Sequence, residues 1–556
     1  MLQIISGKFF ESDERHQSDG YGILYSNYSW IANIDTSVIS LSPVAYKRDS
    51  YVVKYRNQIE KVPNSVLLRV GDEVIVEQFQ NLCTFCFQAI FDTEKRVIER
   101  LCKGDPGKRS TVFPSKVLPR YFNHIIDGDL SEVEHFVKIL EKVISLPRKD
   151  YNRITRCMSA FSGSLKILDY SFDLAYSMLI YCLETLSQKY SPQPKWEDYE
   201  KHPQVDRILQ GVDETIADEV RRTILEDKHL KLQEGFVRFI MDNTSISFFA
   251  EESTSVKSPI RRSEFRQALI SAYAVRSSYA HELEPVLAHL KAGFIEGDVY
   301  HHDNTPYLTY SGLLRLTRHV MLNYIFSQRS VANEQYNWMN DLPNILQMKM
   351  DTRYWLSNAS TFHEKQAKMR LSGYLSELER FIVEKRPLTE CETLMKLYES
   401  KIPNVKGTYK LPMVVHYCLY RPSSPRNDLS HRTKLENYIN SGKFLEACEI
   451  ENLVFCTLTN QNWIWPVKNC EIQYLKYNKK KHKEGALVLP QLFEVVVLIM
   501  LANCHYEQGY YENYPEWIAL AYCEAAGNSK LQSFIRDHWA SGEIIDISEI
   551  FALFKS

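Results

Sequence analysis

The spacing of apolar residues changes once along this 556-residue chain, and that change constrains the fold more than any other feature. Before about Lys103, short runs of β-branched and aromatic residues alternate with turn residues, which is typical of strands. From about Ser131, apolar residues recur at three- and four-residue steps, which is typical of amphipathic helices. Since the chain is also longer than one hydrophobic core usually supports, we predict a multidomain α+β protein.

The first part of the chain predicts a compact β-rich domain. Its expected strands lie at 22–26, 38–41, 51–55 and 74–77. A segment rich in turn residues follows at 104–110, and only two residues separate its glycines, which is too few for a phosphate-binding Walker loop. Cys83 and Cys86 have metal-like spacing, but a structural zinc site needs four ligands. We therefore interpret them as buried strand cysteines, and we predict no metal and no cofactor.

The middle of the chain predicts an antiparallel helical bundle. One of its helices is marked by an apolar stripe of Phe172, Tyr176, Leu179, Leu183 and Leu186. Further helices are expected at 204–242, from about 263, and around 313–324. The resulting domain prediction is a β-rich N-terminal domain at 1–115, a helical connector at 116–149, the bundle at 150–330 and a mostly α-helical C-terminal region at 331–556.

Charge and hydropathy limit the classes of function. The net charge is -2, so any contact with nucleic acid needs a local basic surface. The beginning of the chain lacks the pattern of a signal peptide, and the most apolar run, at 495–502, is too short to cross a bilayer. The 12 cysteines are unremarkable for a reducing compartment. We expect a cytoplasmic protein that makes no use of a membrane.

Within the predicted bundle, an arginine occupies an inward position. Phe265, Leu269 and Ala272 step by four and three residues, and the next position of this stripe is Arg276. A full charge there requires a counter-charge or a cleft. His281 follows five positions later, which on a regular helix is a rotation of roughly 140°. The two side chains can therefore meet only where the helix bends or ends, or between two protomers.

Arginine with histidine suits metal-free cleavage of RNA. Histidine exchanges protons near neutral pH, and a guanidinium group holds a phosphate. The spacing alone is weak support, because composition predicts roughly one such pair by chance and the chain has two. The simpler interpretation is that a carboxylate such as Glu184 neutralises Arg276, and that His281 is a surface residue.

The segment at 270–282, the bundle around it and the closing helix at 312–324 resemble HEPN domains, particularly the ApeA-like branch. The family motif is arginine, then usually a polar residue, and histidine a few positions later. Arg276, Ser277 and His281 occupy these positions, although Ser277 stands where the family most often has Asn, Asp or His. The helix at 172–186, with Glu184 near its end, also resembles the opening helix of that branch.

The resemblance implies a metal-independent endoribonuclease that leaves 2',3'-cyclic phosphates. In that family two protomers usually share one cleft, so it implies a homodimer or higher homo-oligomer. His281 would move the proton, Arg276 would stabilise the phosphate, Ser277 would orient neighbouring groups and Glu184 would support them. The implied partner is RNA, either tRNA or mRNA, and the implied role is a toxin-like or antiviral-defence effector under a phage or antitoxin regulator.

Two other functions stay open. One is a non-catalytic HEPN bundle that serves dimerisation or RNA binding within a larger assembly. The other is a helical adaptor without a nucleic-acid role. RNA cleavage in EDTA that depends on both motif residues would separate the nuclease from these alternatives.

Two further segments carry candidate residues. Arg426 and His431 repeat the spacing of the motif, but they follow two prolines and no apolar stripe precedes them, so a loop is expected there. Lys479, Lys480 and Lys481 belong to the densest basic run, which tyrosines interrupt. Lysines mixed with aromatic residues suit single-stranded nucleic acid, whereas a solvated loop is the simpler interpretation.

Overall fold

The computed structural model describes residues 1–61, 67–104, 112–188, 190, 203–225, 228–291, 297–343, 348, 350–405, 407–423, 433–541 and 544–554. The protein is mixed α+β, with its larger sheet near the N-terminus and helices through most of the remainder. It divides into two compact units, Met1–Ile345 and Leu346–Ser556. This division lies close to the expected boundary at 330/331. The expected boundaries at 115 and 149 do not separate cores, because a single hydrophobic core runs through the first unit.

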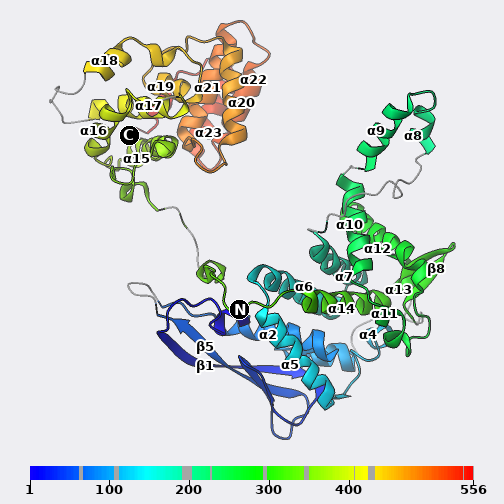
Figure 1. Ribbon diagram of the computed structural model, residues 1–556. Helices are drawn as coiled ribbons and strands as arrows, with labels where there is room; N and C mark the ends of the chain where they lie inside the picture. Colours follow the sequence, from blue (N-terminus) through cyan, green and yellow to red (C-terminus); the bar gives the residue numbers. More distant parts are fainter. Residues whose placement is uncertain are drawn as a thin grey trace. The chain divides into compact units, whose positions relative to one another are not determined.

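A five-stranded sheet forms one side of the first unit (Figure 1). Its order is β3-β4-β5-β1-β6, and every neighbouring pair is antiparallel. The strands are β1 (Arg15–Ser26), β3 (Ile34–Asp35), β4 (Ile39–Pro43), β5 (Ser50–Glu60) and β6 (Phe91–Asp92). Along β5, Tyr51, Val53 and Tyr55 are buried, whereas Lys54 and Arg56 between them are exposed. This alternation confirms a sheet that has one face in the core.

The fourth predicted strand is wrong, because residues 74–77 belong to helix α2 (Asp72–Phe87). Ile75, Val76 and Phe79 point into the core, and the helix packs on the sheet (Figure 1). Cys83 and Cys86 are buried as expected, but they lie on this helix and not on a strand. Burial raises the pKa of the Cys86 thiol to about 12, so this thiol stays protonated in the fold.

Several short elements and two long helices pack around the sheet and the bundle. They are α1 (Leu2–Ile5), α3 (Lys95–Ile98), the π-turn η1 (Glu99–Lys103), α4 (Pro114–Val117), α5 (Leu130–Ser145) and α6 (Arg148–Ile167). Strands β2 (Tyr28–Ser29) and β7 (Ile126–Asp127) pair in parallel beside them. Phe136 of α5 stacks on Phe87 at 4.7 Å between ring centroids, so α5 packs directly on α2. The connector therefore shares the core of the β-rich part.

The helices of the expected bundle follow the predicted positions closely. They are α7 (Phe172–Ser187), α8 (Pro203–Ile208), α9 (Glu214–Leu225), α10 (Lys228–Asp242), α11 (Ile246–Phe249), α12 (Arg262–Glu282), α13 (Ala288–Lys291) and α14 (Tyr310–Ser327). Ser171 caps α7, because its side chain accepts a hydrogen bond from the amide of Leu174. The predicted break at 301–306 is a hairpin of β8 (Val299–His302) and β9 (Thr305–Leu308). The turns η3 (Glu251–Ser253) and η4 (Trp338–Asp341) complete this unit.

The second unit is helical in its described part. Its helices are α15 (Ala367–Glu384), α16 (Glu392–Lys401), α17 (Lys410–Tyr420), α18 (Thr433–Asn440), α19 (Ile450–Leu458), α20 (Val467–Lys480), α21 (Gln491–Glu507), α22 (Tyr514–Glu524), α23 (Ser529–Ser541) and α24 (Ile547–Ala552). The short turns are η5 (Thr352–Tyr354), η6 (Glu364–Gln366), η7 (Gly407–Tyr409), η8 (Arg421–Ser423) and η9 (Lys443–Leu445). Helix α21 is buried on nearly all sides and is the centre of a separate core.

Candidate functional site

Helix α12 presents the predicted motif. A capping box begins the helix, in which the carboxylate of Glu264 accepts the amide of Arg261 at 3.0 Å. Phe265, Leu269 and Ala272 are each at most 1 % exposed, so this stripe faces the core as predicted. Arg276 continues the stripe one turn later and is half-buried.

The side chain of Arg276 faces α7. Its Nη2 lies 2.7 Å from Oε2 of Glu184, and its guanidinium lies 4.9 Å from the centre of the Tyr181 ring. Both charged side chains are about one-fifth exposed, at 21 % and 18 %. The Nε–H of Arg276 is buried and has no hydrogen-bond acceptor in the described part of the chain. The arginine is therefore anchored on one edge and has an unused donor on another.

The surroundings of Glu184 oppose its ionisation. Burial raises the pKa of its carboxyl group above the ordinary value, and the positive charge of Arg276 counteracts only part of this effect. Tyr273 lies one turn before Arg276 on α12. Burial and the nearby charge of Glu184 both raise the pKa of Tyr273. Glu184, Arg276 and Tyr273 thus form one electrostatically coupled group between α7 and α12.

His281 lies on a different side of the same helix. Helix α12 continues unbroken to Glu282, and Leu283 then adopts a left-handed conformation with φ of 56°. The amide of Glu284 donates to the carbonyl of Ser278 at 3.4 Å across this end. His281 is exposed and makes no hydrogen bond or ion pair with the described residues, whereas Ser277 is half-buried.

One copy of the chain does not bring Arg276 and His281 together. Both residues lie within regular helix, so their side chains diverge by roughly 140° around the axis. Arg276 points toward α7, and His281 is in solvent. The helix ends one residue after His281, which is too late to turn the histidine toward the arginine. The pair at Arg426 and His431 lies outside the described residues.

The structure separates the three predicted lysines. Lys479 and Lys480 are exposed near the end of α20, but Lys481 forms an ion pair of 2.7 Å with the buried Glu494. The tyrosines that interrupt this run, Tyr474 and Tyr477, are buried and donate to the same carboxylate at 3.1 Å each. They cannot stack on bases, so the basic run is not the interleaved single-strand surface that its sequence suggested.

Sequence reasoning missed a second histidine on the bundle. His319 of α14 is 5 % exposed, and its Nδ1 lies 2.8 Å from Glu252. Its Nε2 accepts the amide of Ser245 at 3.1 Å, so Nδ1 carries the proton and donates it to the carboxylate. This hydrogen bond holds the pKa of Glu252 below its ordinary value. These hydrogen bonds hold the loop around Glu252 against α14. Because His319 and Glu252 are 67 residues apart, no local sequence motif could have revealed the contact.

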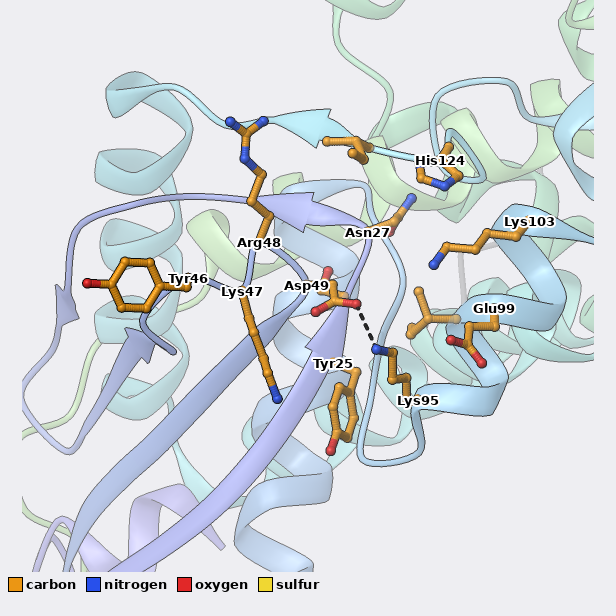
Figure 2. A pocket seen from close by; sticks show the side chains of 13 residues that line it. Tyr25, Asn27, Tyr46, Lys47, Arg48, Asp49, Lys95, Glu99, Lys103 and His124 are labelled. Atoms are coloured by element: carbon orange, nitrogen blue, oxygen red, sulfur yellow. Dashed lines mark ion pairs between the residues drawn. The ribbon is translucent and has the colours of Figure 1, made fainter.

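A hollow of about 290 Å³ lies beside the N-terminal sheet, near Asn27 (Figure 2). At its centre Lys95 pairs with Asp49 at 3.2 Å. The side chains of Tyr46 and Arg48 point away from this pair (Figure 2). Lys103 lies on the side of the hollow opposite to Tyr46 and Arg48 (Figure 2). The cations do not converge on one point, so the hollow is a weaker candidate than the motif on α12.

Comparison with known proteins gives no match to a family model, to a curated protein or to a solved structure. Among the described residues, no three His, Cys, Asp or Glu side chains are grouped as metal ligands. In the same part of the chain, no helix combines the length and the apolar character needed to cross a bilayer.

Proposed function

We propose that the protein is a metal-independent endoribonuclease of HEPN type that acts in the cytoplasm as a homodimer or higher homo-oligomer. The observation that carries this proposal is the state of Arg276. A guanidinium group that is held by one carboxylate, rests on an aromatic ring and is still about one-fifth exposed, at 21 %, is pre-organised to receive an anion on its exposed side. The phosphate of an RNA backbone fits this chemistry.

His281 supplies the complementary function. Its imidazole is exposed and unpaired among the described residues, so a ribose hydroxyl can reach it. Since Arg276 and His281 diverge on one helix, the arginine of one copy meets the histidine of a second copy in a shared cleft. Such a two-fold arrangement forms two equivalent composite sites.

The reaction follows from these roles. His281 takes the proton of the 2'-hydroxyl, the 2'-oxygen forms a bond to phosphorus, and the bond from phosphorus to the 5'-oxygen breaks. The leaving 5'-oxygen takes a proton from water, His281 releases its proton to solvent, and Arg276 stabilises the added negative charge on the phosphate. The products are a 2',3'-cyclic phosphate and a 5'-hydroxyl. Ser277 orients groups beside the arginine, and Glu184 holds the guanidinium in place.

The proposed biological role is a toxin-like or antiviral-defence effector that acts on tRNA or mRNA under a phage or antitoxin regulator. A second candidate is a non-catalytic HEPN bundle for dimerisation or RNA binding. The ion pair between Arg276 and Glu184 favours this second candidate, because the same pair would also serve a purely structural arginine.

Incubation of the purified protein with total RNA in EDTA tests the nuclease. We expect the wild type to cleave, and Arg276→Ala and His281→Ala each to lose about 100-fold or more of the rate. Arg266→Ala on the same helix and His16→Ala on β1 are matched controls, since Arg266 is half-buried like Arg276, His16 is exposed like His281, and both lie outside the motif. Absence of cleavage by the wild type, or equal cleavage by the motif variants and the controls, would overturn the proposal.

A further inference from the structure

The second unit contains a groove of about 760 Å³ that lysines dominate. Helices α15, α17, α19 and α20, the turn η9 and the loop after α20 all contribute to it. Its cationic residues are Lys368, Lys410, Lys443, Lys476, Lys480, Lys481 and Lys483. The anionic residues of its lining are Glu449, Glu451 and Glu484. Positive charge from segments far apart in the sequence is therefore concentrated around one hollow.

Carboxylates neutralise some of these lysines. The pairs are Lys368 with Glu451 at 3.2 Å, Lys476 with Glu449 at 3.9 Å and Lys481 with Glu494 at 2.7 Å. The lysines in these pairs serve the structure of the unit and leave little charge for a ligand.

The other four lysines line the groove outside these ion pairs, and Glu484 is the one carboxylate of the lining that these pairs leave over. Lys410, Lys443, Lys480 and Lys483 form no ion pair with a described carboxylate. Their positive charges around one hollow create a positive potential there, which favours the entry of an anion. Several separate ammonium groups suit a ligand that carries more than one phosphate.

The groove also has an apolar and aromatic part. Leu411, Phe444, Ile450 and Leu487 line it, and the ring of Tyr438 lies 4.2 Å from Nζ of Lys410. A volume of 760 Å³ falls within the range of small-molecule sites, which is roughly 300–1,000 Å³. A planar base can therefore be accommodated beside the phosphates.

From these observations we infer that the groove binds a free nucleotide with at least two phosphates. Lys443, Lys480 and Lys483 contact the phosphates, the apolar part of the groove takes the base, and Lys410 stays over the ring of Tyr438 between them. The site belongs to the second unit and does not depend on the proposed nuclease. Its test therefore measures binding and not RNA cleavage.

The direct experiment is calorimetric titration of the full-length protein with ATP, with adenosine and with a single-stranded ten-nucleotide RNA. We expect binding of ATP and no measurable binding of adenosine. The double variant Lys443→Gln/Lys483→Gln removes two exposed charges, so the fold should persist, and ATP affinity should fall at least about tenfold. Lys479→Gln is the matched control, because this lysine is adjacent to Lys480 but does not line the groove.

Two outcomes of the titration would overturn the inference. In the first, the wild type fails to bind ATP at millimolar concentration. In the second, the double variant binds ATP as tightly as the wild type does. Binding of the RNA without binding of ATP would instead assign the groove to nucleic acid. If the double variant melts at a lower temperature than the wild type, Lys480→Gln on the exposed end of α20 replaces it and must show the same direction of change.

Discussion

Removal of Arg276 should leave the half-buried carboxylate of Glu184 without a counter-charge. In Arg276→Ala, Glu184 keeps its place on α7 but loses the guanidinium 2.7 Å away. With an effective dielectric constant of about 20 and roughly 4 Å between charge centres, the lost attraction is about 4 kcal/mol. Hydration of Glu184 through the vacated space returns roughly 1 to 2 kcal/mol, because both groups are partly exposed. We expect the first unit to be destabilised by about 2 to 3 kcal/mol at pH 7.5.

The destabilisation caused by Arg276→Ala should depend on pH, and the pKa of Glu184 sets the direction of this dependence. Burial already raises the pKa of Glu184, and loss of Arg276 raises that pKa further. A carboxyl whose pKa is higher in the folded state stabilises the fold at low pH, and this contribution is lost as the pH rises through the folded value. The cost of Arg276→Ala should therefore shrink as the pH falls from 8 toward the ordinary value of 4.5.

The assay is unfolding in urea, detected through the hydrogen exchange of peptides from α7 and α12. Because both helices belong to the first unit, this signal reports the first unit alone. The double variant Arg276→Ala/Glu184→Gln should recover at least half of the loss, because no buried charge remains. Arg266→Ala removes a more exposed ion pair from the same helix and should cost less than about 1 kcal/mol. A loss that is the same in the single and double variants, or the same at pH 5 and pH 8, would refute the reasoning.

Two further predictions concern packing and protonation. Gly312 touches the main chain of Asp298, so the methyl group of Gly312→Ala must displace it, and urea unfolding should show a loss of about 3 kcal/mol. Burial lowers the pKa of His416 to about 3, from an ordinary value of 6.5. Since the unfolded chain binds a proton at this histidine more readily than the folded protein does, the folded state is fully stable above pH 6.5 and loses stability as the pH falls toward 3. The second unit should lose at most about 1.4 kcal/mol per pH unit there, and exchange of α17 peptides should show a weaker dependence in His416→Leu. An unchanged midpoint in the first variant, or equal slopes with and without His416, would contradict these expectations.

Residue spacing located three strands of the larger sheet and the main helices in the middle of the chain. The helices at 172–187 and 262–282 follow their apolar stripes, and Ser171 caps the first of them as its side chain allows. The run at 74–77 has the local preference of a strand, because Val74, Ile75 and Val76 are β-branched. Packing against the sheet overrides that local preference, and the stripe that continues through Phe79 belongs to a helix.

The candidate site was predictable only where its residues share one helix. The phase of α12 placed Arg276 inward, and the structure pairs it with Glu184, one of the interpretations that the sequence left open. The clamp of His319 on Glu252 and the convergence of lysines on one groove depend on tertiary contacts between distant segments. Neither has a local signature, so sequence spacing could not reveal them.

The shared site between two copies is the central claim, and mixing two inactive variants tests it most directly. Arg276→Ala and His281→Ala would be denatured and refolded together in equal amounts, then assayed on RNA in EDTA. Half of the dimers should be mixed, and each mixed dimer should hold one of its two composite sites intact, so about a quarter of wild-type activity should return. Activity in the mixture no greater than in either variant alone would contradict a site that Arg276 and His281 form between two copies.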